Sequence, residues 1–451
     1  MRYYSHLDKG VTAQFGDALL ASLAPDGGLW MPDAIPKFTP DEMATLGAMD
    51  FADCAAELAT YFTDDRFDKA ALKALCHDAY NFDVPMVTFD GQRLDPAMPP
   101  NADEFVLELF HGPTLAFKDF AARFMGRAAS HLMQKSGARR TILVATSGDT
   151  GGAIGDAFLG QDGVEVFILF PKGGVSTVQE RQLCTIGEAG SNVRALAVDG
   201  TFDDCQALVK QAFADQDMTQ RFDLMSANSI NVGRVVPQSF YYLWASLQAK
   251  AAYPLRQLVI SIPSGNLGNL TGGLMARAMG APIDRFIVAN NANDPFVDYL
   301  VDGEYRPRPS VPTLSNAMDI GRPNNFPRIL SLFGEDLEAI RSAIWGASFD
   351  DDSTARHIRR VYQDTGYLLC PHTAVGHMGT LAFREGHDLD ATYLTVGTAH
   401  PAKFADSIET IIREDVPLPP ALAAAMTRDP RVTTLEPSLS ALSDYIASEL
   451  G

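Results

Sequence analysis

Short runs of apolar, often β-branched residues recur along the chain and predict buried β-strands. Each run is followed by a tight loop and then by apolar residues at helical spacing. The five runs are residues 141–146, 164–170, 193–198, 257–262 and 391–396. Such alternation of strand and helix is typical of a parallel sheet with right-handed crossover connections. We therefore expect an α/β fold.

Other segments follow a different pattern. Residues 50–62 and 68–80 have apolar side chains at helical spacing, so residues 1–84 are expected to be mostly helical. Residues 23–38 are rich in proline and glycine and predict a loop. Residues 294–328 are dense in proline, asparagine and glycine, and a loop of that length is usually functional. The C-terminal segment is expected to be a helical tail over the surface.

The composition limits the kinds of molecule that the chain is expected to bind. The chain has 451 residues, 46% hydrophobic and 20% charged, and a formal net charge of −20. An acidic surface repels nucleic acid and anionic membranes over a Debye length of roughly 8 Å. We therefore expect neither as a partner. A small anionic ligand would need local donors that act against this overall charge.

Cysteine usage indicates a compartment. The five cysteines are widely spaced and form no C-x-x-C pair: Cys54, Cys76, Cys184, Cys205 and Cys370. This spacing favours reduced thiols over disulfides or a zinc site. The N-terminus has no apolar signal region, and no apolar run approaches the ~18 residues of a membrane span. The expected location is the cytoplasm.

Three glycine-containing loops leave the ends of predicted strands, at residues 147–152, 264–269 and 397–401. In an open parallel sheet, ligands bind beyond the carboxyl ends of the strands. Each loop opens a helix, and main-chain N–H groups at a helix N-terminus favour an anion. The loop SGNLGN (264–269) thus predicts a phosphate site. The glycine loops match neither the G-x-G-x-x-G fingerprint nor a Walker A loop, which argues against NAD and ATP.

Lys118 lies in the stretch HGPTLAFKDF (111–120), directly after an apolar segment. Desolvation lowers the pKa of a lysine, and a neutral amine is a nucleophile toward aldehydes. Thr398 supplies a hydroxyl at a third strand end. A lysine for an aldehyde, a glycine loop for one phosphate and a hydroxyl for a ring nitrogen together suit pyridoxal phosphate.

These segments resemble those of the threonine synthase family, pyridoxal-phosphate enzymes of the tryptophan-synthase-β-like fold. The resemblance covers nearly the whole chain and looks like the branch with an N-terminal extension. The matching segments are MRYYS, LAPDGGLWMP, HGPTLAFKDF, ATSGDTGGAIGDAF, SANSINVGR, IPSGNLGN, TLSNAMDIGRPNNFPR, CPHTAVG and GTAHPAKF.

The resemblance implies the fold of these enzymes, pyridoxal-phosphate fold type II. It comprises two parallel-sheet αβα domains and a mostly helical N-terminal extension. We expect the extension at residues 1–84, a large cofactor-binding domain at 85–138 and 236–451, and a small substrate-side domain at 139–235.

It also implies roles for individual residues. Lys118 matches the lysine that forms the internal aldimine with the cofactor. Thr398 matches the hydroxyl that hydrogen-bonds the pyridine nitrogen. The residues that match the cup for the cofactor phosphate are Gly265, Asn266, Leu267, Gly268 and Asn269. Leu267 and Asn269 depart from the commoner form of this cup but leave its main-chain donors intact.

The residues that match the loop for the substrate α-carboxylate are Ser147, Gly148, Asp149 and Thr150. Asp149 replaces the asparagine usual across the wider fold, where that residue faces the ring oxygen of the cofactor. Two neighbouring anionic oxygens are unfavourable unless one is protonated, so this contact is left open. For the substrate phosphate, Arg234 is the first candidate, since guanidinium grips phosphate in bidentate fashion. Ser226, Asn231 and Ser315 are its candidate partners, with local capping as the alternative.

Further residues of the matched motifs have open roles. Asp319, Arg322 and Asn325 lie in the long loop, which is expected to close over the site as a lid. Asp119 is expected to cap or pair structurally. His372 and His377 are interpreted as structural or site-lining rather than metal-binding, because no H-E-x-x-H motif occurs. His111 and His400 are candidates for positions near the substrate.

The implied activity is that of a lyase in threonine biosynthesis. It converts O-phospho-L-homoserine and water into L-threonine and phosphate, in a monomer or homodimer. A serine or threonine dehydratase on the same fold is one alternative, against which the N-terminal extension and Arg234 argue. A catalytically silent relative that senses pyridoxal phosphate or a phosphorylated metabolite is another, against which the intact Lys118, SGNLGN and Thr398 argue.

Overall fold

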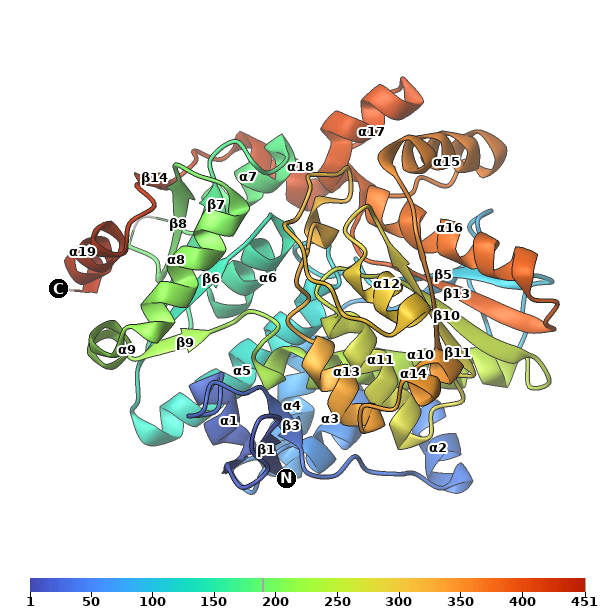
Figure 1. Ribbon diagram of the computed structural model, residues 1–451, viewed down its shortest axis with the longest axis horizontal. Coiled ribbons are helices and arrows are strands. Elements are labelled where there is room, and N and C mark those ends of the chain that lie inside the picture. The colour runs from blue at the N-terminus through green and yellow to red at the C-terminus, as the bar shows by residue number, and fades with distance from the viewer. Residues whose placement is uncertain (189, 451) are drawn as a thin grey trace.

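Two β-sheets lie side by side, each covered by helices, in the computed structural model, which describes residues 1–188 and 190–450 (Figure 1). The larger sheet has the strand order β12-β11-β10-β13-β5-β4. Its strands are parallel except for β4, which runs antiparallel to β5. Their bounds are β4 Met86–Val87, β5 Glu104–Glu108, β10 Gln257–Pro263, β11 Arg285–Asn290, β12 Ile344–Ser348 and β13 Ala391–Gly397.

The smaller sheet is parallel throughout, in the order β14-β8-β7-β6-β9. Its strands are β6 Arg140–Ala145, β7 Val164–Pro171, β8 Val193–Val198, β9 Leu224–Ser226 and β14 Val432–Leu435. Helices in the same part of the chain are α6 Asp149–Phe158, α7 Thr177–Cys184, α8 Phe202–Ala214 and α9 Gln216–Phe222.

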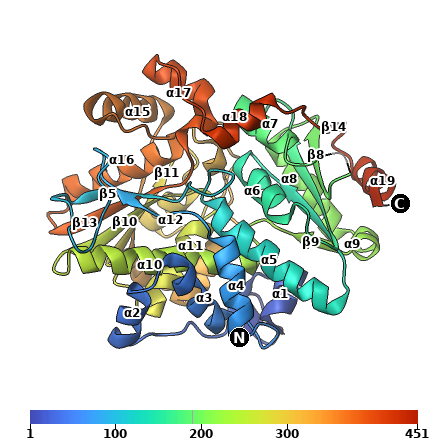
Figure 2. The same cartoon turned by 180° about the vertical axis from the view of Figure 1, so that it is seen from behind.

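The N-terminal part forms a layer of its own. A small antiparallel sheet combines β1 Arg2–Ser5, β2 Thr12–Gln14 and β3 Trp30–Pro32. Four helices accompany it: α1 Phe15–Ala21, α2 Pro40–Gly47, α3 Phe51–Phe62 and α4 Lys69–Ala79. Figure 2 shows this layer below α5 (Lys118–Ser136) and α10 (Val236–Ala252). The ring of Phe51 meets that of Phe120 at 5.5 Å between centroids, which anchors the layer to α5.

The remaining helices cover the larger sheet and its loops, except the last two, which pack against α7 and α8. They are α11 Gly268–Met279, α12 Pro295–Asp302, α13 Phe326–Phe333, α14 Leu337–Ala343, α15 Asp351–Thr365, α16 Pro371–Gly386, α17 Ala405–Ile412, α18 Pro420–Thr427 and α19 Leu439–Leu450. Three short 3-10 helices are η1 Val232–Arg234, η2 Asn316–Met318 and η3 Pro401–Phe404. None of the helices in the described residues is long and apolar enough to cross a bilayer.

The five strands predicted from apolar runs are confirmed as β6, β7, β8, β10 and β13, and their neighbours run parallel. Two loop predictions were wrong in part. Residues 23–38 contain β3, and residues 294–328 begin with α12, where Pro295 occupies the first turn and so disturbs no helical hydrogen bond.

The C-terminal segment was expected to be a helical tail, and this was wrong in one respect. It contributes the strand β14, which pairs with β8, and the buried Leu442 and Ile446 of α19 pack in the apolar cluster of the smaller sheet. The expected domain boundaries stay a prediction. The strand β14 lies in the smaller sheet although residues 236–451 were assigned to the larger domain.

Candidate active site

The loops at the carboxyl ends of four parallel strands surround one cavity of about 530 Å³. β5 leads to the segment that ends at Lys118, β6 to Ser147–Thr150, β10 to Ser264–Asn269, and β13 to Thr398. Lys118, Asp149, Asn269 and Thr398 all line this cavity. The predicted convergence of loops at strand ends is thus observed.

Lys118 is held beside Thr398 by main-chain hydrogen bonds. The N–H of Phe117 donates to the carbonyl of Thr398 at 2.8 Å, and the N–H of His400 donates to the carbonyl of Leu115 at 3.0 Å. An isolated antiparallel bridge joins Ala116 to Ala399. The start of α5 is therefore attached to the loop after β13.

The environment of Lys118 favours a neutral amine. Burial, followed by the charge of Arg234, lowers the pKa of Lys118 to about 8, against an opposing effect of Asp149. The side chain is partly exposed and lines the cavity. Among the described residues no hydrogen bond or ion pair engages its Nζ, which lies 4.5 Å from the ring centre of Phe117. The structure thus agrees with the lowered pKa predicted from the sequence.

The loop SGNLGN forms a tight turn at the N-terminus of α11. A Cβ on Gly265 would lie 2.7 Å from the Cα of Met318, so only glycine fits against η2. Leu267 has a left-handed backbone with φ 59°, an uncommon conformation for a leucine. The loop lines the cavity and leads into α11, and the first N–H groups of a helix suit an anion.

Asn269 adds a side-chain donor to this loop. Its Oδ1 accepts hydrogen bonds from the hydroxyls of Tyr241 at 2.6 Å and Tyr242 at 2.8 Å. Its Nδ2 is buried and has no partner in the part of the chain that the structure describes. Because the tyrosines fix the amide orientation, the two N–H bonds of Nδ2 are left for a ligand.

The hydroxyl of Thr398 is buried and lacks a hydrogen-bond partner among the described residues. A buried hydroxyl without a partner is costly and is expected to meet a ligand or water. Thr398 also lines the cavity that contains Lys118 and the glycine loop. An aldehyde-reactive amine, a main-chain phosphate site and an unpartnered hydroxyl therefore fit pyridoxal phosphate.

The loop Ser147–Thr150 begins α6 from the smaller sheet. Gly148 has φ +132°, which an L side chain rarely adopts, and a Cβ there would lie 2.4 Å from Nε2 of Gln179. Ser147, Asp149 and Thr150 line the cavity, whereas Gly148 does not. This helix N-terminus again presents main-chain donors suited to an anion such as a carboxylate.

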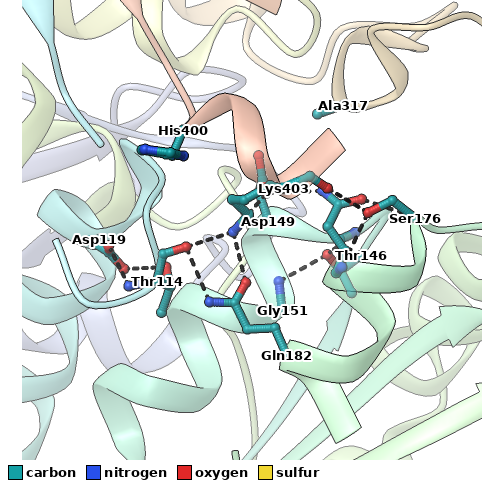
Figure 3. A network of polar contacts seen from close by, with 12 residues as sticks. Thr114, Asp119, Thr146, Asp149, Gly151, Ser176, Gln182, Ala317, His400 and Lys403 are labelled. Atoms are coloured by element: carbon teal, nitrogen blue, oxygen red, sulfur yellow. Dashed lines mark hydrogen bonds and ion pairs between the residues drawn. The ribbon is translucent and has the colours of Figure 1, made fainter. Parts of the chain in front are cut away.

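The partners of Asp149 stabilise its ionised form. Burial raises the pKa of Asp149, but the charges of Lys403 and His372 and hydrogen bonds from Gln179 and Lys403 outweigh it, so that the pKa is lowered. Its Oδ1 lies 3.0 Å from Nζ of Lys403 and accepts a bond of 3.0 Å from Nε2 of Gln179. Figure 3 shows Lys403 among these polar contacts.

The four candidates for the substrate phosphate divide into two pairs. Arg234 and Ser226 line the cavity, whereas Asn231 and Ser315 do not. The amide of Asn231 donates to the carbonyls of Leu19 and Ser226 and accepts from the N–H of Gly233, and Ser315 accepts from Asn291. These contacts hold the surrounding backbone together and leave neither side chain directed at the cavity lining.

Arg234 is buried with a cation facing the cavity. Its Nη1 donates to the carbonyl of Ala227, while its Nε is buried without a partner among the described residues. Burial lowers the pKa of Arg234 to about 10, against opposing effects of Asp119 and Tyr241. The guanidinium therefore keeps donors available for an anion.

The four histidines singled out from the sequence occupy different places. His372 lines the cavity, its Nε2 accepts from the N–H of Ala317 at 3.1 Å, and burial lowers its pKa to about 4. His111 lies 2.7 Å from Glu108 and His400 caps η3, and neither lines the cavity. His377 contacts His357 and Glu104 and does not line the cavity.

The long loop contacts the glycine loop directly. Nδ2 of Asn325 donates to the carbonyl of Asn266 at 3.0 Å, and the N–H of Asn324 donates to Oδ1 of Asn266 at 2.5 Å. Asp319 accepts from Thr313 and Asn291, and Arg322 is exposed. A lid role for Asp319, Arg322 and Asn325 stays a prediction.

Two residues that sequence reasoning did not assign to the site belong to its surroundings. In the sequence, Lys403 is only one residue of the segment GTAHPAKF, and its burial beside Asp149 depends on partners far away in the sequence. Gln179 orients Asp149 from α7. Asp119, expected to have a structural role, accepts hydrogen bonds from the N–H and hydroxyl of Thr114.

Family models match three parts of the chain. Residues 100–399 match the model described as pyridoxal-phosphate dependent enzyme. Residues 2–80 match the threonine synthase N terminus, and residues 373–446 match the threonine synthase C-terminal model. The matched residues include every loop that lines the cavity from the two parallel sheets.

Curated and solved relatives agree with these matches. The threonine synthase of Serratia marcescens is 40% identical over 94% of both chains. The crystal structure of threonine synthase from Escherichia coli has 38% identity, covers 99% of this chain and 100% of its own, and superposes with a TM-score of 0.88. The PLP-bound threonine synthase from Brucella melitensis has 37% identity, covers 100% and 99%, and gives a TM-score of 0.89.

Proposed function

The chain belongs to the threonine synthase family of pyridoxal-phosphate-dependent enzymes, and from this premise we propose that it converts O-phospho-L-homoserine and water into L-threonine and phosphate. One observation carries the assignment of residues. Lys118, the glycine loop and the unpartnered hydroxyl of Thr398 line the same cavity, although they come from three strand ends.

The residues that would hold the cofactor are those that fit its chemical groups. Lys118 would bind its aldehyde carbon, and Thr398 would donate its free hydroxyl to the ring nitrogen. The main-chain donors of residues 265–269 and the amide of Asn269 would bind its phosphate. When bound, pyridoxal phosphate supplies a conjugated ring that accepts electron density from the substrate Cα.

The amine of Lys118 would move the protons. With a pKa lowered to about 8, a useful fraction of this amine is neutral near neutral pH and can act as a general base. It would remove the proton from Cα of the substrate. Once it has passed that proton to the cofactor, the free amine would remove a proton from Cβ as the phosphate leaves Cγ. It would then return one proton to Cγ, which becomes the methyl group, and one to Cα, while water adds its hydroxyl to Cβ and gives its remaining proton to the released phosphate.

Two anion sites would orient the substrate. The N-terminus of α6, at Ser147, Asp149 and Thr150, would bind the α-carboxylate through main-chain donors. Arg234, with Ser226, would bind the phosphate to be released, because its guanidinium faces the cavity with unused donors. The scaffold contacts of Asn231 and Ser315 support no such role for these two residues.

We also propose that the enzyme works in the cytoplasm as a monomer or homodimer, without nucleic acid. The five cysteines are free and buried, which suits a reducing compartment. Burial raises the pKa of the thiols of Cys54, Cys184 and Cys205 to about 12, so these groups remain unreactive.

A product assay tests the reaction. The purified protein, loaded with pyridoxal phosphate, is expected to release threonine and phosphate from O-phospho-L-homoserine in a ratio of one to one. It is expected to release no ammonia from L-serine or L-threonine. Ammonia from serine without phosphate release would favour the dehydratase alternative, and absence of both reactions would favour the sensor alternative.

A further inference from the structure

Lys403 places a positive charge where water does not reach. Its side chain has 0% exposure, and its Nζ donates to the carbonyl of Thr114 at 2.6 Å and to Oε1 of Gln182 at 2.9 Å. It also lies 3.0 Å from Oδ1 of Asp149. An ammonium has three donors, so these three acceptors satisfy it completely. A buried charge needs such partners to be tolerated.

The three acceptors come from different parts of the fold (Figure 3). Thr114 lies in the segment that leads to Lys118 from the larger sheet, and Lys403 itself follows Thr398 in the loop after β13. Asp149 and Gln182 belong to α6 and α7 of the smaller sheet. The ammonium therefore joins the loops of both sheets next to Asp149, which lines the candidate site.

Only one oxygen of Asp149 is used in these contacts. Its Oδ1 meets both Lys403 and Gln179, whereas no described residue donates a hydrogen bond to its Oδ2. Asp149 lines the same cavity as Lys118, and its charge raises the pKa of that amine. An ionised Asp149 without Lys403 would thus have Lys118 as an alternative partner.

We propose that Lys403 is a positioning residue of this site. Its ammonium holds together the loops that carry Lys118, Asp149 and Thr398, and it engages the Asp149 carboxylate so that the Lys118 amine stays free to react. The inference rests on the proposed function only for the reaction in which the free Lys118 amine takes part. The contact with Lys403 also explains why position 149 is an aspartate. An asparagine there would leave the Lys403 ammonium without a counter-charge.

Other titratable groups also contribute to the charge around Lys118 and Asp149. The titratable and charged groups that interact with Lys118 or Asp149 are Arg234 from η1, His372 from α16 and Cys370 at the start of that helix. Burial lowers the pKa of His372 to about 4 and raises the pKa of Cys370, so both are neutral near pH 7. Arg234 and Lys403 are then the fixed cations.

The test measures the Lys118 amine in the protein without cofactor. Trace acetic anhydride labels neutral amines, and peptide mass spectrometry at a series of pH values gives the midpoint for Lys118. Lys403→Met is expected to raise this midpoint by at least about half a pH unit, because Asp149 then pairs with Lys118. The double variant Lys403→Met with Asp149→Asn is expected to show no such rise. Lys250→Met, which removes an ammonium bound to the carbonyl of Arg256, is the matched control.

A midpoint in Lys403→Met at or below that of the wild type would overturn the proposal. If that variant does not fold, the single variant Asp149→Asn takes its place in the test. Its labelling midpoint for Lys118 is expected to fall below the wild-type value, because the charge of Asp149 raises the pKa of Lys118. An unchanged midpoint in Asp149→Asn would then overturn the proposal. Since labelling requires no turnover, these outcomes are independent of whether the protein makes threonine.

Thermal unfolding of the same variants supplies a second test. Lys403→Met leaves a buried carboxylate without its cation, so it is expected to lower the unfolding midpoint more than the double variant does. Equal losses in the two variants would show that Lys403 only fills space and would overturn the electrostatic part of the proposal. Lys403→Arg is expected to recover part of the loss, because it retains the charge.

Discussion

The main-chain N–H of Phe117 donates a hydrogen bond of 2.8 Å to the carbonyl oxygen of Thr398. This contact fixes the start of α5 against the loop after β13, so the position of Lys118 relative to Thr398 is set by the backbone. Side-chain substitutions at Lys118 or Thr398 therefore leave this geometry in place. Their effects report the chemistry of the side chains.

Thr398→Val tests the unpartnered hydroxyl. Valine has nearly the same shape but cannot donate to a ring nitrogen, so weaker retention of pyridoxal phosphate and slower turnover are expected. The free energy of unfolding of the cofactor-free protein should change little, because the hydroxyl has no partner within the described residues. Equilibrium dialysis and denaturant unfolding check the two expectations.

Thr395→Val, on the strand β13 that leads to Thr398, is the matched control. Its hydroxyl is buried 3.0 Å from that of Thr380, so its removal is expected to lower stability by ~1 kcal/mol without affecting cofactor binding. If the two variants lose cofactor equally, the role proposed for Thr398 is contradicted.

Gly265→Ala tests the fit of the glycine loop. The added Cβ would lie 2.7 Å from the Cα of Met318, so either η2 or the loop must move. We expect at least ~10-fold weaker binding of pyridoxal phosphate, measured by fluorescence titration, because a shift of the turn misaligns its main-chain donors. Gly386→Ala, where a Cβ meets nothing within 4 Å, should bind like the wild type. Unaltered binding in Gly265→Ala would exclude this loop as the phosphate site.

The pKa of Lys118 predicts a pH dependence for cofactor capture. Because this pKa is lowered to about 8, the neutral fraction of the amine increases as the pH rises toward 8 and levels off above it. The rate at which the cofactor-free protein captures pyridoxal phosphate should fall ~10-fold per pH unit below that value. Stopped-flow absorbance checks this, and a rate independent of pH between 6 and 8 would contradict it.

The site was predictable from the sequence where local chemistry is enough. Glycine turns at strand ends and a lysine after an apolar segment are local signals, and they led to Lys118, the SGNLGN loop and Thr398. Lys403 gave no such signal, because its acceptor at Thr114 lies 289 residues away. Asn231 belongs to a matched motif, yet its amide is consumed by the carbonyl of Leu19, 212 residues away.

The fold was predictable to a similar extent. Long apolar runs predicted β6, β7, β8, β10 and β13 correctly, since buried parallel strands read as continuous hydrophobic segments. The buried interior strands β5 and β11 were not predicted. The shorter edge strands β12 and β14 were missed because they are only partly buried and contain glycine, serine or threonine. Their pairing with β11 and β8 is decided by tertiary contacts.

Buried histidines predict loss of stability in acid. Burial, followed by the charge of Arg360, lowers the pKa of His377 to about 4, below its usual value of about 6.5. The unfolded chain therefore binds a proton more readily than the folded one, so stability is present above pH 6.5 and is lost as the pH falls. Protonation of this residue alone should lower the free energy of unfolding by about 2 kcal/mol between pH 8 and pH 5.

Denaturant unfolding at several pH values measures this dependence. Replacement of His377 by asparagine should reduce the slope of stability against pH below 6.5. A His377 variant with an unaltered slope would contradict the assignment.

The central claim is that the Lys118 amine holds the cofactor and moves the protons. Borohydride reduction of the loaded enzyme, followed by peptide mass spectrometry, should find the pyridoxyl group on Lys118. Lys118→Ala should lose this label and at least ~10³-fold of the rate of threonine and phosphate formation, while Lys135→Ala on the same helix should keep both. A pyridoxyl group on another lysine, or turnover by Lys118→Ala near the wild-type rate, would contradict the account.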